Sequence, residues 1–139
     1  SMGTYGMLAR EGKTDLDSWV EAITRDKLQI VGFDMIGLCK FFDIVNGIGT
    51  DMVVDCLAAE HGLKVTREEL QAAVKRAFLR GLVLEQRQGY GKQEYCLPAE
   101  VTAQPNRNIT LPDLTTPEFL AELDTGVWEV FDREIRDLL

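Results

Sequence analysis

Apolar residues at the start of the chain recur with helical spacing. They occupy positions i, i+3, i+4 and i+7 and are Leu16, Trp19, Val20 and Ile23. Such a stripe predicts an amphipathic helix that packs on one face, and Thr14 is its candidate N-cap. Residues 28–45 are apolar nearly all round, so we expect a buried helix there, or two short helices joined near Gly32.

Cap signals divide the middle of the chain into further helices. Thr50 is the last residue of the loop "NGIGT" and a candidate cap for a helix that carries Met52, Val53, Cys56 and Leu57. Gly62 stands where a helix-ending glycine belongs. Thr66 and Glu69 form a capping box that opens a helix with the stripe Leu70, Val74, Ala77 and Phe78.

The second half of the chain is ambiguous before its last helix. Residues 82–97 fit either a continued helix with a loop, or a short β-hairpin that turns at residues 89–91. Thr116 as N-cap and Pro117 at the first helical position open a final helix, in which Gly126 is a weak point. Its apolar stripe is Leu120, Leu123, Val127, Phe131, Ile135 and Leu138.

These patterns predict an all-α fold of about five helices, with or without one short hairpin near residues 82–97. The length of 139 residues fits a single domain over residues 1–139, in which residues 1–12 and 99–115 are loosely structured. Hydrophobic residues make up 45% of the chain, which is typical of a globular fold. Charged residues interrupt every long apolar run, so we expect no membrane segment, and the first residues lack the pattern of a signal peptide.

Charge and cysteine content narrow the possible partners. The net charge of −8 disfavours contact with nucleic acid, whose phosphates would be repelled. Three widely spaced cysteines form no paired framework and favour a reducing, cytoplasmic location. His61 is the only histidine, which excludes a metal site built on two histidines of this chain.

The segment "DMIGLC", residues 34–39, is similar to the second D-x-x-G-L-C motif of the aldehyde ferredoxin oxidoreductases. Downstream, "VKRAFLRGLVLEQRQGYGKQEYCLP" aligns without a gap to the pattern that follows the motif in that family. The matching positions are Arg76, Arg87, Gly89, Leu97 and Pro98. The segments "GLKVTREEL" and "PEFLAELDTGVWEVFD" also resemble family helices, so the resemblance covers residues 15–135 and concerns the C-terminal helical domain alone.

Some positions depart from the family pattern. Glu85 occupies the position of the family's asparagine, and Gln88 occupies the position of an acidic residue. Glu94 and Tyr95 occupy the positions of an acidic pair. The three other cluster cysteines, the first D-x-x-G-L motif and the N-terminal β-domain precede this region in the family and are not in this sequence. The resemblance therefore implies a fragment of a larger enzyme or a split-off relative.

The resemblance also implies roles for the motif. Cys39 would be the fourth thiolate of a four-iron four-sulfur cluster, and Asp34 would accept hydrogen bonds from a pterin. Gly37 would allow close approach of backbone or cofactor, and Leu38 would present main-chain groups beside the pterin. The parent enzyme would oxidise aldehydes to carboxylic acids and pass electrons from a tungsten or molybdenum bis-pterin through the cluster to ferredoxin. Without its N-terminal and middle domains, the chain would bind no cofactor and be inactive.

Plainer roles exist for the same residues. Cys39 alone is typical of a small core residue, and Asp34 of a helix N-cap. We expect Cys56, Trp19 and Trp128 in the core, no ligand role for Cys96, and Arg76 and Arg87 paired with surface acids. The alternative function is a non-enzymatic module, either of winged-helix type with residues 81–97 as the wing, or a helical interaction domain that uses residues 28–45.

Overall fold

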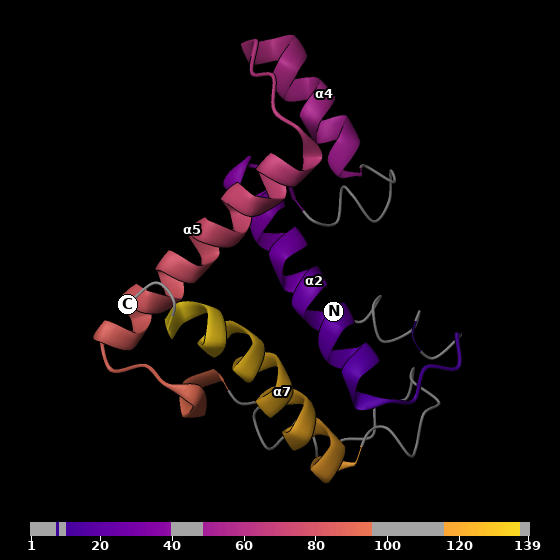
Figure 1. The fold of residues 1–139 in the computed structure, drawn as a ribbon, viewed down its shortest axis with the longest axis vertical. Coiled ribbons are helices and arrows are strands. Elements are labelled where there is room, and N and C mark those ends of the chain that lie inside the picture. The colour runs from indigo at the N-terminus through magenta and orange to yellow at the C-terminus, as the bar shows by residue number, and fades with distance from the viewer. Residues whose placement is uncertain (1–7, 9–10, 40–48, 96–115, 137–139) are drawn as a thin grey trace. The chain divides into compact units, whose positions relative to one another are not determined.

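The computed structural model describes residues 8, 11–39, 49–95 and 116–136. This part of the chain is all-helical, which confirms the predicted fold class (Figure 1). It holds four α-helices and one 3-10 helix, which are α2 (Leu16–Met35), α4 (Thr50–His61), α5 (Arg67–Arg87), η1 (Lys92–Tyr95) and α7 (Pro117–Arg136). None of these helices is apolar over a stretch long enough to cross a membrane.

Helix α2 begins one residue later than its sequence signal suggested. The Asp15 carboxylate, not Thr14, accepts the Ser18 N–H at 2.8 Å and so caps the first turn. This hydrogen bond from Ser18 lowers the pKa of the exposed Asp15 carboxyl. The helix then runs through Gly32 without a break, so the alternative of two short helices joined near Gly32 is wrong.

The predicted caps of α5 and α7 are present, and the predicted cap of α4 is not. Thr66 and Glu69 form the predicted capping box, with Thr66 N–H donating to Glu69 Oε2 at 2.8 Å and Glu69 N–H to Thr66 Oγ1 at 3.1 Å. Thr116 Oγ1 accepts the Phe119 N–H at 3.2 Å, ahead of Pro117 at the start of α7. At α4 the N-cap is Gly49, and Thr50 is the first helical residue rather than the cap.

The hairpin proposed for residues 82–97 is wrong over its described part, residues 82–95. Helix α5 continues to Arg87, and Gly89 then takes a φ of 91°. The Tyr90 N–H donates to the Glu85 carbonyl at 3.1 Å and the Gly89 N–H to the Gln86 carbonyl at 3.0 Å, which is the Schellman arrangement of a helix end. Residues 92–95 are a 3-10 helix, and residues 96–97 lie outside the described part. Leu82 is buried and belongs to the apolar stripe of α5, so burial of this side chain favours the continued helix over a hairpin.

Contacts divide the chain into two compact units, residues 1–26 with 81–139, and residues 27–80. The first part of α2 belongs to the first unit and its end to the second unit. The first part of α5 belongs to the second unit and its end to the first. The single domain predicted over residues 1–139 stays a prediction. Residues 99–115 lie outside the described part, and of residues 1–12 only 8, 11 and 12 are described.

The first unit is built around α7. Its predicted stripe is confirmed at Leu123, Val127, Phe131 and Ile135, which are buried. Leu120 is half-buried, and Leu138 lies outside the described residues. The other buried apolar residues of this unit are Leu8, Trp19, Ala22, Ile23 and Leu82. Trp19 is a core residue as predicted, and its ring and that of Phe119 form an edge-to-face pair with a centroid distance of 5.7 Å and an angle of 89° between their planes. Trp128, by contrast, is only half-buried.

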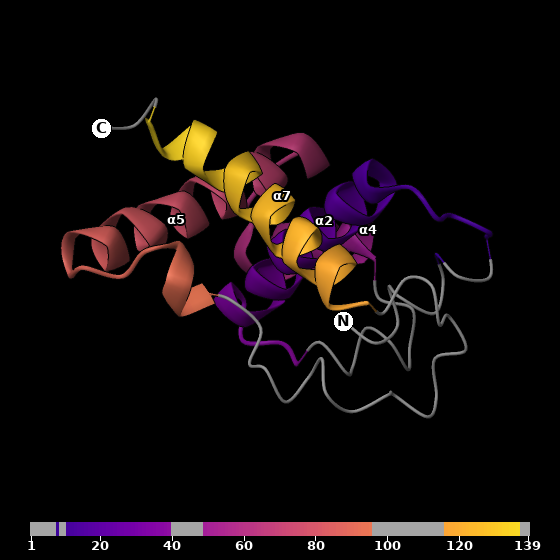
Figure 2. The same cartoon turned by 90° about the horizontal axis from the view of Figure 1, so that it is seen from below.

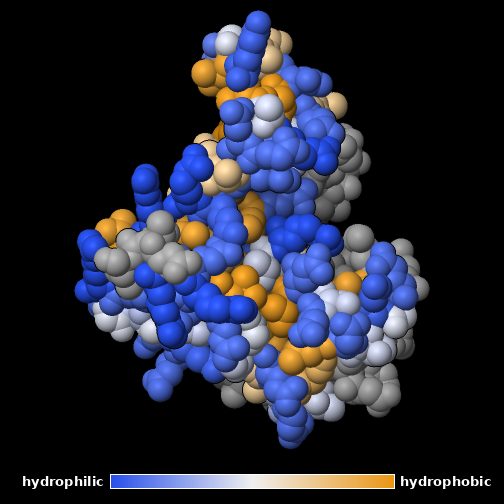
Figure 3. All heavy atoms as spheres, in the orientation of Figure 1, coloured by the Kyte–Doolittle hydropathy of each residue, from blue (hydrophilic) through white to orange (hydrophobic). Residues whose placement is uncertain are grey.

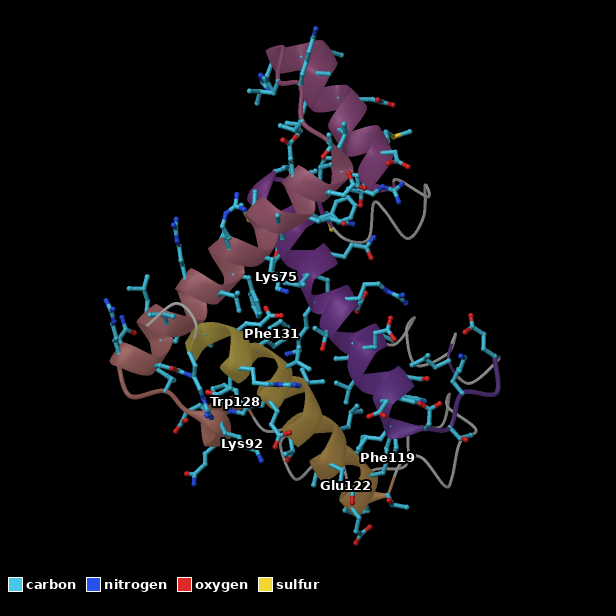
Figure 4. The ribbon with its side chains drawn as sticks, in the orientation of Figure 1. Lys75, Lys92, Phe119, Glu122, Trp128 and Phe131 are labelled. Atoms are coloured by element: carbon cyan, nitrogen blue, oxygen red, sulfur yellow. The ribbon has the colours of Figure 1, made fainter. Side chains whose placement is uncertain are left out.

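Gly126 lets α7 approach the first part of α2 (Figure 1 and Figure 2). A Cβ at this position would lie 2.6 Å from Val20 Cγ2, closer than packed carbon atoms approach each other. On the other side of α7, Lys92 Nζ donates to Thr125 Oγ1 at 2.7 Å and ties η1 to the helix (Figure 4). The residue that weakens α7 as an isolated helix is therefore the one that its packing requires.

We expect Gly126→Ala to destabilise the chain by about 1–3 kcal/mol, because the added methyl overpacks the contact with Val20. Gly81→Ala is the matched control, since Gly81 also lies inside a helix but a methyl group there would meet no neighbouring side chain within 4 Å. It should raise stability by roughly 0.5–1 kcal/mol through helix propensity. Urea unfolding measures both free energies, and an equal gain for both variants would contradict the close packing.

Candidate functional site

The end of α2 is shaped by Gly37. This residue has a φ of 73°, and the helix closes over it in a Schellman arrangement. The Leu38 N–H donates to the Phe33 carbonyl at 2.9 Å, and the Gly37 N–H donates to the Asp34 carbonyl at 3.1 Å. A side chain at position 37 would find open space but a strained backbone, so the glycine is needed for its dihedral angle.

Leu38 has a structural task in the same turn. Its side chain packs against the buried pair Phe33 and Val53, together with the partly buried Ile36, Leu57 and Leu70. Its N–H already donates to the Phe33 carbonyl and is therefore not available to a ligand. The local sequence Gly-Leu is thus explained by the way the helix ends, and a role of these two residues beside a pterin stays a prediction.

Asp34 and Cys39 are the two motif residues that this turn does not use. Asp34 is exposed in the last turn of α2, so the alternative that it caps a helix N-terminus is wrong. Cys39 is a free and exposed thiol, so the alternative that it is a core residue is also wrong. The last turn of α2 holds no basic residue, and the carboxylate therefore adds to the negative end of the helix dipole.

The predicted burial of residues 28–45 is not observed in residues 28–39. Phe33 is the one buried residue there, and its neighbours are half-buried or exposed. Residues 40–45 lie outside the described part. The reason is geometric: the end of α2 packs one face on α4 and α5, although the sequence is apolar on more than one.

An open hollow of about 350 Å³ lies between the end of α2 and α4. Ile36 and Leu38 form one wall, and the α4 residues along it are Met52, Val53, Cys56, Leu57, Glu60 and His61. The prediction that Cys56 is a core residue is wrong, because it is exposed on this wall. Helical spacing placed Met52, Val53 and Cys56 on one face, but Val53 alone among the α4 residues is buried. The sequence did not predict that, on this face of α4, Val53 is buried while Met52 and Cys56 are exposed.

The charged groups of the second unit form one clear pair. Arg67 donates from Nε to Asp51 Oδ1 at 2.7 Å and from Nη2 to Oδ2, and this hydrogen bonding raises the pKa of Arg67. The pair joins the starts of α4 and α5, and no signal in the sequence pointed to it. Arg76 and Arg87, predicted to pair with surface acids, are exposed and make no ion pair with a described residue.

The described residues do not form a metal site by themselves. Among them, no three His, Cys, Asp or Glu side chains gather closely enough to hold a metal ion. Cys39 can therefore serve as a single donor at most, together with ligands from elsewhere. Cys96 lies outside the described part.

Comparison with known proteins identifies no relative. No protein-family model, no curated protein and no solved structure matches the chain. The resemblance to the aldehyde ferredoxin oxidoreductases thus depends on the motif residues quoted above and on the chemistry of the site.

The Gly37 turn leads to a direct test. Gly37→Ala should destabilise the chain by about 1–2 kcal/mol, because a Cβ is strained on a left-handed backbone. Gly37→Asn should lose less, since asparagine tolerates that conformation better. Thermal or urea unfolding of the two variants measures the difference. Equal stability of wild type and Gly37→Ala would show that the turn does not need glycine.

Proposed function

We propose that this chain is the C-terminal helical domain of an aldehyde ferredoxin oxidoreductase-like enzyme. One observation supports this most: a free, exposed thiol follows directly after a helix end that also carries an exposed carboxylate. An exposed sulfur can reach a metal that other parts of a protein hold, and a buried one cannot. Cys39 and Asp34 are the two motif residues whose side chains the local fold leaves without a structural task.

The thiol of Cys39 fits a shared cluster better than a site within this chain. A four-iron four-sulfur cluster takes four thiolates, and the described residues contain only Cys39 and Cys56 as cysteines. Cys39 would supply one thiolate, and the missing N-terminal and middle domains would supply the rest. When bound, the cluster would carry electrons from the tungsten or molybdenum bis-pterin to ferredoxin during aldehyde oxidation.

The protein's part is to place and hold these two side chains. The Leu38 contact with Phe33 and Val53 fixes the backbone immediately before Cys39. Asp34 would accept hydrogen bonds from the N–H groups of a pterin, as an ionised carboxylate is an acceptor only. Its place at the negative end of α2 strengthens the attraction for such donors.

The proposal includes a cytoplasmic, reducing location, which keeps thiols such as Cys39 and Cys56 free. The chain alone would be inactive, because its three cysteines cannot supply all four thiolates of the cluster. The winged-helix alternative loses support, since residues 81–95, which would begin its wing, contain no strand.

The test uses the full product of the gene that encodes this chain, purified without oxygen. Cys39→Ala should remove most of the cluster iron and its electron paramagnetic resonance signal, because one of four ligands is lost. Cys56→Ala is the matched control, since Cys56 is also a free and exposed cysteine of the second unit and should keep the iron.

In the chain alone, Cys39→Ala should change the free energy of unfolding by less than about 0.5 kcal/mol, because the side chain is exposed. This control separates loss of a ligand from loss of the fold. A wild-type gene product without iron, or unchanged iron in Cys39→Ala, would overturn the proposal.

A further inference from the structure

We draw no further inference here: the strongest candidate, the open hollow between the end of α2 and α4, near which apolar side chains reach the surface around α4 (Figure 3), carries none, because nothing in the described part of the chain shows what covers it.

Discussion

The ends of α2, α4 and α5 depend on glycines that adopt a left-handed backbone. Gly37, Gly62 and Gly89 have positive φ angles and follow α2, α4 and α5 respectively. At such a residue an amino acid with a Cβ meets a steric penalty, so the helix stops there and the chain changes direction. The position of each glycine thereby decides which residues leave the helix and reach the surface.

The consequence is clearest after α2. Because Gly37 turns the chain, Leu38 folds back onto Phe33 and closes the apolar cluster with Val53. The next residue, Cys39, is then left outside this cluster, and Asp34 is exposed in the last helical turn. One backbone constraint thus explains a leucine contact with the core, an exposed thiol and an exposed carboxylate within one short stretch of sequence.

The sequence predicted those features that depend on local chemistry. The Thr66–Glu69 capping box, the Thr116 cap, the Gly62 terminator and the α7 stripe are all present. Two helix starts were displaced by one residue, because Asp15 competes with Thr14 and Gly49 with Thr50 for the cap position. Local preferences are similar for such neighbours, so the surrounding contacts decide between them.

Features that depend on packing between distant segments were missed. A Gly-Tyr-Gly sequence suits a hairpin turn and a helix end equally, and burial of Leu82 decided for the helix. The need for a glycine at position 126 follows only from the contact with Val20, which the sequence does not show. In the same way, the motif at residues 34–39 suggested candidate ligands, but it did not predict which of these residues are exposed in the fold. The hollow beside Cys56 had no signal in the sequence.

The central claim is that the Cys39 sulfur lies on the surface of the folded chain. It is tested most directly by the rate at which a thiol reagent labels a variant whose other cysteines, Cys56 and Cys96, are replaced by serine. The account predicts labelling in native buffer nearly as fast as in concentrated urea, because no opening of the structure is needed. Labelling that proceeds only as fast as the whole chain unfolds would contradict it.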